Sequence, residues 1–523
     1  MKLSRRGFLA WSAAALADPL SHAGYTASGG ETGSARSSTL YNETYRPQFH
    51  FSPEKNWMND PNGLVYYRGE YHLFYQYNPF AEVWGHMSWG HAVSKDLLHW
   101  TPLPIALREH DGIAIFSGSA VVDWNNTSGF GSKEHPPLIA TFTGNGDGKQ
   151  TQNIAYSTDR GRNWRRYKGN PVIDIHGRDF RDPKVFWYKP GGYWVMIVSL
   201  ASQHKVRFYA SSNLKDWRQL SEFGPAGAKN PPNWECPDIY PLPVSNEPGA
   251  TKWVLEVGIG DHAVAGGSGG QYFIGEFDGK TFINDNPPER ILWVDYGMDF
   301  YAAQTWSDIP DGRRIMLGWM DNWKYAGNVP THPWRGQMSI PRVVTLERRP
   351  EGIRMLQSPV AELQALREEP LLVNERILSG ASGVDREKNS GETLEILAQF
   401  ELGSAAEFGL KLRKGAGQET VVGYNVPNHE VFVDRTRSGK TNFSPAFPGR
   451  HAAPLAPEDR QIKLHIFLDR CSVEVFANGG IAVITDLIFP DPAAKGLQFY
   501  AKNGNVRLRS ASIWKLQSVY PQP

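Results

Sequence analysis

The chain has 523 residues, of which 40% are hydrophobic and 21% charged, an ordinary balance for a globular protein with a sizeable core. Lys and Arg together number 55 and Asp and Glu 54, so the formal net charge is +1. This balance argues against nucleic acid or an anionic membrane surface as the main partner, because either favours a strong basic excess, and it fits neutral substrates better.

The first 23 residues predict an export signal. Paired arginines, Arg5 and Arg6, precede a mild apolar run that ends at Leu16, and Ser21-His22-Ala23 fits a small-x-small cleavage site. Residues 24–45 then predict a flexible leader, rich at first in Gly, Ser and Thr. We therefore expect a secreted, extracellular protein that uses the twin-arginine route. No later stretch reaches the ~18–20 apolar residues that span a membrane.

Residues 46–357 predict an all-β domain built from a repeated unit. Short runs of Val, Ile, Tyr, Phe and Trp alternate with Gly, Pro, Asn and Asp, which is typical of many short strands. A strand, a Ser/Asp/Asn/Gly turn and an aromatic residue recur. The closing aromatic residues are spaced by 64, 53 and 65 positions, at Trp100, Trp164, Trp217 and, in degraded form, Phe282.

A second series of residues runs in step with the first, near the start of each unit. Its members are separated by 57, 65, 53 and 64 positions and are Asp60, Ser117, Asp182, Glu235 and Asp299. Units of this size suit a four-stranded propeller blade, and radial stacking brings equivalent positions around one channel. The sequence therefore predicts a five-bladed β-propeller with five polar positions at one mouth.

The remainder of the chain predicts a second β domain. Residues 358–370 have apolar residues at helical spacing and predict a connecting helix. From residue 371 to 523 alternating strands resume, which favours a β-sandwich.

Three short segments place an acidic residue beside proline or aromatic residues: WMNDPNG (57–63), FRDP (180–183) and WECPD (234–238). Cleavage of a glycosidic bond needs one ionised and one protonated carboxyl group, and crowding of acids in one funnel separates their pKa values. A metal site is the chemical alternative. However, no His, Asp and Glu cluster has convincing ligand spacing, so we expect neither a metal nor a cofactor.

The chain resembles glycoside hydrolase family 32, in particular its exo-inulinase and levanase branch. The resemblance covers essentially the whole mature chain and includes WGHMSWGHAVSKDLLHW (84–100), FSGSAVVDWNNTSG (116–129), DFYAAQTW (299–306) and PWRGQMSIPR (333–342). It implies a five-bladed propeller with an appended sandwich, and a retaining β-fructofuranosidase, an exo-acting levanase or inulinase, whose substrate is a fructan or a fructo-oligosaccharide.

The resemblance also implies roles for individual residues. Asp60 would be the nucleophile that forms a covalent fructosyl-enzyme, Glu235 the general acid and base, and Asp182 the residue that stabilises the transition state. The pocket for the terminal fructosyl unit would be lined by Asn59, Gln76, Trp84, Phe116, Ser117, Arg181, Tyr301 and Trp319. For Trp84 and Trp319 the alternative is packing inside the blades.

Two other functions stay open at this stage. Asp261 and His262 stand where the branch usually has other residues, and they could reshape the acceptor side of the funnel. The fructosyl-enzyme could then be attacked by a hydroxyl of the same chain, which would make the protein a levan fructotransferase that releases a difructose anhydride. A propeller that binds fructan without catalysis is the more remote alternative.

Overall fold

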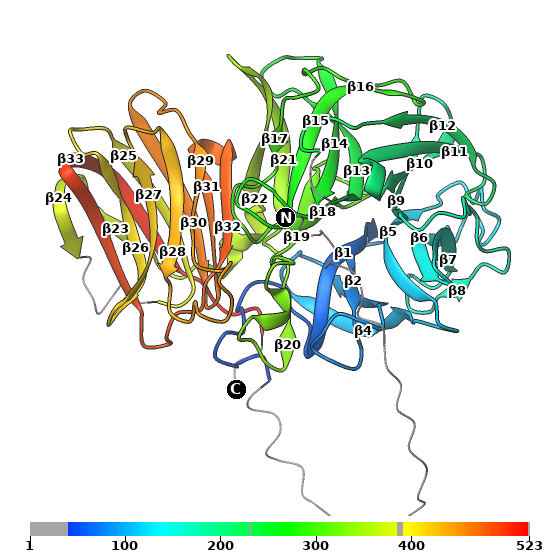
Figure 1. Ribbon diagram of the computed structural model, residues 1–523, viewed down its shortest axis with the longest axis horizontal. Coiled ribbons are helices and arrows are strands. Elements are labelled where there is room, and N and C mark those ends of the chain that lie inside the picture. Colours follow the sequence, from blue (N-terminus) through cyan, green and yellow to red (C-terminus); the bar gives the residue numbers. More distant parts are fainter. Residues whose placement is uncertain (1–39, 230–231, 384–390, 521–523) are drawn as a thin grey trace, which may run out of the picture.

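The computed structural model describes residues 40–229, 232–383 and 391–520, and nearly all of its regular structure is β. The predicted export signal and most of the leader lie outside these residues. Two bodies stand side by side, a ring of sheets formed by the first part of the chain and a sandwich formed by the last part (Figure 1). No helix in the described ranges is long and apolar enough to cross a membrane.

The ring consists of five sheets, which confirms the predicted five-bladed propeller. Each sheet is built mainly from strands that follow one another in the chain. The first blade contains β1 (Asn56–Tyr67), β2 (Glu70–Tyr77), β3 (Ser88–Ser94) and β4 (Trp100–Leu107). The second contains β5 (Ala114–Val122), β6 (Leu138–Gly146), β7 (Lys149–Ser157) and β8 (Arg165–Arg166). The third contains β9 (Phe180–Tyr188), β10 (Tyr193–Leu200), β11 (Lys205–Ser211) and β12 (Arg218–Phe223).

The last two blades complete the ring. The fourth contains β13 (Trp234–Pro243), β14 (Thr251–Ile259), β15 (Gly269–Phe277), β16 (Phe282–Asn284) and β17 (Leu292–Trp293). The fifth contains β18 (Tyr301–Thr305), β19 (Ile315–Trp319), β21 (Arg342–Arg349) and β22 (Gly352–Pro359). Between β19 and β21, the short strand β20 (Trp334–Arg335) pairs in parallel with β1, and this pairing joins the last blade to the first. Short 3₁₀ turns are η1 (Ala201–Gln203) and η2 (Ala326–Asn328).

The repeated turn predicted from the sequence joins the third and fourth strands of a blade. After β3, the Asp96 carboxylate accepts the backbone N–H of His99 at 2.8 Å, and the Trp100 indole donates to the Leu97 carbonyl at 3.0 Å. After β7 and β11 the equivalent indoles donate to turn carbonyls at 3.0 and 3.1 Å, from Trp164 and Trp217 respectively. The aromatic residue therefore closes its own turn by a hydrogen bond as well as packing at the hairpin end.

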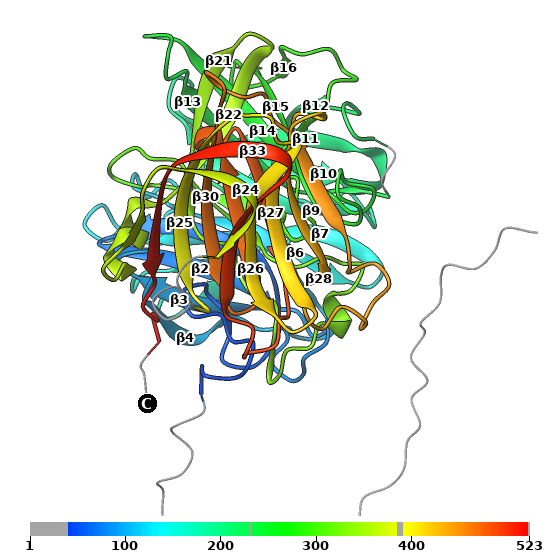
Figure 2. The same ribbon diagram turned by 90° about the vertical axis from the view of Figure 1, so that its left-hand side faces the viewer.

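The sandwich is one continuous eleven-stranded sheet that folds over itself (Figure 2). Its long last strand, β33 (Gly496–Lys515), pairs with four strands: β23 (Leu371–Val373), β24 (Arg376–Gly383), β25 (Leu394–Glu401) and β26 (Glu407–Gly415). The other strands are β27 (Gln418–Asn425), β28 (Glu430–Arg437), β29 (Arg450–Pro454), β30 (Gln461–Asp469), β31 (Ser472–Ala477) and β32 (Ala482–Leu487). The inner faces enclose one apolar core, which includes Ile396, Phe408, Val433 and Phe499.

The segment for which the sequence predicts a connecting helix holds a short 3₁₀ helix, η3 (Ala361–Leu366). Leu363 and Leu366 of η3 are buried in a core shared by propeller and sandwich residues. A further 3₁₀ turn, η4 (Asn478–Gly480), lies between β31 and β32. Both bodies therefore contact each other through apolar side chains on each side of the linker.

A buried ion-pair network also joins the sandwich to the propeller, and it includes one of the five predicted mouth residues. Asp299 is fully buried and pairs with Arg435 of β28, while its other carboxylate oxygen accepts the Tyr325 hydroxyl at 2.5 Å. Asp299 is therefore not at the mouth, which corrects that expectation. The reason is that the fifth blade packs against the sandwich, so its first polar residue serves the interface.

Candidate active site

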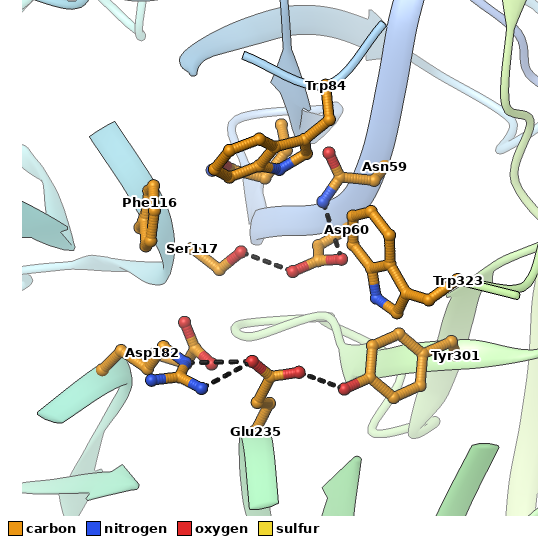
Figure 3. Close-up of a pocket in the computed structure, with 11 residues that line it drawn as sticks. Asn59, Asp60, Trp84, Phe116, Ser117, Asp182, Glu235, Tyr301 and Trp323 are labelled. Carbon is orange, nitrogen blue, oxygen red and sulfur yellow. Dashed lines mark hydrogen bonds and ion pairs between the residues drawn. The ribbon is translucent and has the colours of Figure 1, made fainter. Parts of the chain in front are cut away.

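A pocket of about 170 Å³ opens at the axis of the propeller, and the first strand of every blade contributes to it (Figure 3). Ten of the eleven site residues predicted from the sequence line it, and the exception is Trp319. The lining consists of Asn59, Asp60, Gln76, Trp84, Phe116, Ser117, Arg181, Asp182, Glu235, Tyr301 and Trp323.

An interruption of strand pairing aims these side chains at the axis. The register of the first strand shifts at the pocket residue in all five blades: near Asp60 in β1, Ser117 in β5, Asp182 in β9, Glu235 in β13 and Tyr301 in β18. A β-bulge re-aims a side chain that regular pleating would direct elsewhere. In every blade, a pocket residue therefore lies at or beside an interruption of the regular strand pairing.

Asp60 lies at the base of the pocket and is 8% exposed. The Ser117 hydroxyl donates to its Oδ2 at 2.7 Å, and the Asn59 amide donates to its Oδ1 at 3.0 Å. Burial raises the pKa of Asp60 above its usual range, the two donors lower it in part, and the nearby Glu235 charge raises it again. The two donors hold the carboxylate in one orientation.

Asp182 lies beside Asp60 and is 6% exposed. Its backbone is in the left-handed region with φ 66°, and its N–H donates to the Thr143 hydroxyl at 2.9 Å. The backbone N–H of Cys236 donates to Oδ2 of Asp182 at 2.9 Å. Burial raises the pKa of Asp182 to about 7; Arg181 lowers it, and the charges of Glu235 and Asp60 raise it. The pocket therefore binds a proton near neutral pH.

Glu235 faces Asp60 and Asp182 from the fourth blade. Arg181 donates to Oε1 of Glu235 from Nε at 3.0 Å and from Nη2 at 2.8 Å. The Tyr301 hydroxyl donates a short hydrogen bond to Oε2. Both oxygens of Glu235 are thus held by donors from the neighbouring blades.

Cys236 connects the carboxyl groups. Its Sγ lies 3.4 Å from Oδ2 of Asp60 and 3.6 Å from Oδ2 of Asp182. Burial and the three surrounding carboxyl groups raise the pKa of this thiol well above its usual range. A neutral thiol places an apolar, weakly donating group between two acids and keeps water from that position. Cys236 and Cys471 are both free and buried.

The aromatic wall differs in one residue from the sequence expectation. Trp319 is completely buried and packs against Trp57 and Trp323, with ring centroids 6.0 and 4.9 Å apart. It supports the wall from behind, whereas Trp323, which is 38% exposed, lines the pocket. Trp84 is 50% exposed and makes an edge-to-face contact with Phe116, with ring centroids 6.0 Å apart. The alternative of packing within the fold thus describes Trp319 and not Trp84.

The residues that suggested an altered acceptor side lie near this wall. Asp261 forms an ion pair with Lys324, Nζ to Oδ2 2.6 Å, and Lys324 directly follows Trp323. His262 is exposed and does not line the pocket. The sequence did not identify Trp323 as a pocket residue, because two tryptophans four residues apart are equally good candidates until the end of the strand is known. The ion pair between Asp261 and Lys324 was not predicted either.

The described residues contain no group of three His, Cys, Asp or Glu side chains that could hold a metal ion. The acids of the pocket are bound by serine, asparagine, arginine and tyrosine donors. Nε2 of Gln76, a buried residue of the pocket lining, has no protein partner in the described part of the chain.

Comparison with known proteins gives matches over most of the chain. The model for the glycosyl hydrolases family 32 N-terminal domain matches residues 50–359, and that for the family 32 C-terminal domain matches residues 362–515. A levanase of Bacillus subtilis (strain 168) is 53% identical over 492 residues, which cover 93% of this chain and 72% of that protein. An extracellular exo-inulinase of Aspergillus awamori is 40% identical over 517 residues, covering 92% and 96% of the two chains.

Solved structures agree with these matches. The crystal structure of the exo-inulinase from Aspergillus awamori superposes with a TM-score of 0.87 at 39% identity, covering 92% of this chain and 100% of that chain. A β-fructofuranosidase from Schwanniomyces occidentalis, complexed with fructosyl-erythritol, gives 0.85 at 33% identity over 93% and 100%. Fold and sequence together define the protein as a glycosidase. The chain belongs to glycosyl hydrolase family 32.

Proposed function

We propose that the protein is a retaining β-fructofuranosidase that releases the terminal fructosyl unit of a fructan through a covalent fructosyl-enzyme. The observation that carries this proposal is the placement of Asp60 and Glu235 in one pocket, each held by donors. A small pocket of about 170 Å³ suits one terminal sugar unit, which favours exo action. The similar levanase and exo-inulinase support fructan as the substrate.

In the first half-reaction a carboxylate oxygen of Asp60 attacks the anomeric carbon of the fructosyl unit, and the bond to the leaving oxygen breaks. Glu235 gives its proton to that oxygen. In the second half-reaction Glu235 takes a proton from a water molecule, whose oxygen attacks the anomeric carbon. Asp60 then leaves as a carboxylate, and fructose departs with the anomeric configuration retained.

The crowding of acids supplies the proton that this scheme needs. Burial, together with the charges of Glu235 and Asp60, raises the pKa of Asp182 to about 7, so the pocket holds a proton close to Glu235 near neutral pH. Asp182, beside Asp60, is suited to accept hydrogen bonds from sugar hydroxyl groups as positive charge develops. Arg181 orients Glu235, and Trp84 and Trp323 offer faces to the apolar side of the sugar.

We also propose that the protein is secreted, with residues 1–23 as its export signal. The paired arginines of the N-terminus and the extracellular exo-inulinase relatives support this. Residues 46–357 are proposed as the catalytic propeller and 371–523 as a supporting sandwich. A levan fructotransferase is not favoured, because relatives that are 53% and 40% identical to the chain are named as a levanase and an exo-inulinase.

The test is product analysis by chromatography after incubation with levan and, separately, with inulin, beside an Asp60→Ala variant. Release of free fructose by the wild type but not by the variant supports an exo-hydrolase. The polymer that is degraded at the higher rate identifies the preferred linkage. A non-reducing difructose as the main product would show that the reaction is intramolecular transfer and not hydrolysis. Binding without any product would leave only a binding propeller. Addition of methanol tests retention, because a fructosyl-enzyme is expected to yield the methyl β-fructoside.

A further inference from the structure

A second and larger cavity, of about 400 Å³, lies on the second blade where it meets the first. Its floor is one face of the β6–β7 hairpin, which presents Phe142, Gly144 and Gly146 from β6. The paired residues of β7 on the same face are Asn153, Thr151 and Lys149. We call this cavity the blade recess.

Two glycines lie in the floor of the blade recess. Gly144 pairs with Thr151, and Gly146 pairs with Lys149, so two positions of the floor carry no side chain. A Cβ atom at Gly144 would lie 2.8 Å from the Asn153 amide nitrogen and 3.2 Å from Ile113. The two glycines therefore let Ile113 and Asn153 approach the floor closely, and Ile113, Tyr167 and Pro171 form walls of the recess.

The opposite face of the same hairpin supports the active site. Thr143 accepts the backbone N–H of Asp182 at 2.9 Å, and the Gln150 side chain accepts Nη1 of Arg181 at 3.3 Å. Ile113 at the recess directly precedes β5 and is three residues from Phe116 at the pocket, which corresponds to about 10 Å of extended chain. The recess and the catalytic pocket thus lie on two sides of one two-stranded wall.

Polar groups of the recess suit a neutral, hydroxyl-rich ligand. Nε of Arg166 and Nδ1 of His110 are buried without a protein partner in the described residues. The two lining cations, Lys149 and Arg166, are matched by two lining carboxylates, one of which, Asp174, pairs with Lys149 at 3.1 Å, so the lining carries no net charge that would favour an anion. An apolar floor beside polar groups that lack a protein partner suits a sugar, whose C–H faces pack and whose hydroxyl groups donate and accept hydrogen bonds.

We propose that the blade recess binds a second segment of the fructan substrate, away from the bond that is cleaved. This rests on the proposed function, since the ligand is the same polymer whose end enters the catalytic pocket. The recess raises the apparent affinity for long chains, because a second contact on one polymer adds to the first. It contributes nothing to a substrate as short as sucrose.

The test compares kcat/KM for levan with kcat/KM for sucrose. Arg166→Ala removes a free donor, and Thr151→Tyr fills the hollow opposite Gly144. Each is expected to lower the levan-to-sucrose ratio about tenfold, the effect of losing one or two good hydrogen bonds. The matched control is Arg165→Ala, which changes the exposed neighbouring arginine outside the recess and is expected to keep the wild-type ratio.

A binding measurement separates this proposal from the catalytic one. In an Asp60→Ala background, retardation during electrophoresis through a levan-containing gel is expected to fall with Arg166→Ala and to persist with Arg165→Ala. Equal retardation of both, or an unchanged levan-to-sucrose ratio, would overturn the recess proposal. So would thermal stabilisation by inorganic phosphate that Arg166→Ala abolishes. If the wild type cleaves neither substrate, the catalytic proposal fails, and the gel still decides the recess.

Discussion

Arg181 donates two hydrogen bonds to a single oxygen of Glu235, from Nε at 3.0 Å and from Nη2 at 2.8 Å. Its third nitrogen, Nη1, reaches Asp179 at 3.1 Å, so the guanidinium group is fixed from both sides. A planar fork of this kind sets the direction of the carboxyl group as well as its charge. The orientation of Glu235 toward the pocket therefore depends on an arginine from the neighbouring blade.

The first prediction concerns this fork. Arg181→Lys keeps the positive charge but cannot donate twice in a plane, so Glu235 is expected to reorient. We expect kcat to fall roughly 100-fold, the scale of misplacing a catalytic group by about 1 Å. Steady-state kinetics on sucrose measures this. Arg178→Lys, at an exposed position three residues earlier, is the control, and full activity of Arg181→Lys would contradict the argument.

The second prediction concerns pH and stability. The folded protein raises the pKa of Asp182 from 3.8 to about 7, so it holds a proton that the unfolded chain releases at lower pH. As the pH rises through this window the free energy of unfolding therefore falls. Asp182→Asn cannot ionise. Between pH 4 and 7 we expect the wild type to lose roughly 2–4 kcal/mol more than the variant.

Urea unfolding at several pH values measures this difference. Asp216→Asn, at an exposed position, is expected to follow the wild-type curve. Parallel pH curves for wild type and Asp182→Asn would show that the carboxyl group is not protonated by folding.

The third prediction separates the two neighbouring tryptophans. Trp323→Ala removes an exposed wall of the pocket, and we expect KM to rise about fivefold, since one aromatic contact contributes about 1 kcal/mol. Trp319→Ala leaves a cavity behind that wall, and we expect the free energy of unfolding to fall by about 3–5 kcal/mol. Kinetics and urea unfolding of both variants distinguish wall from support. A stability loss that is equal in the two would contradict this division.

The fourth prediction concerns the interface between the two bodies. Arg435→Met leaves the buried Asp299 without its cation and removes the longer of two ion pairs of Asp486, and we expect the free energy of unfolding to fall by about 3–5 kcal/mol. Arg437→Met on the same strand removes an arginine that is 61% exposed, and its expected cost is below about 1 kcal/mol. Thermal unfolding compares them. Equal shifts in Tm would mean that the buried network contributes no more than a surface pair.

Most of the propeller could be predicted because each blade repeats a turn whose hydrogen bonds join residues close together in the sequence. A turn needs its Ser, Asp or Asn acceptor and its closing aromatic residue at fixed spacing, so Trp100, Trp164 and Trp217 mark successive blades. The acids in phase with these turns fall on first strands, and Asp60, Asp182 and Glu235 do share one pocket.

The repeat did not predict the position of a side chain correctly where contacts between distant parts of the chain determine that position. Asp299 occupies the same phase as the other four residues, yet the sandwich supplies Arg435 to it from 136 residues further along the chain. No local pattern encodes such a partner. Likewise, Trp319 ends a strand and turns inward, whereas Trp323 follows in a loop and faces the pocket. Which of two tryptophans contacts a ligand depends on where the strand stops.

The five interrupted first strands have a consequence for how this pocket can change over generations. Asp60, Ser117 and Asp182 fall inside the register shifts of their strands, whereas Glu235 and Tyr301 lie at the edge of theirs and still pair with the next strand. Within one strand, most of the residues that pair with the next strand are therefore not the residues that line the pocket. A lineage, or an engineer, can exchange the contents of the pocket one blade at a time while the ring that carries it stays intact.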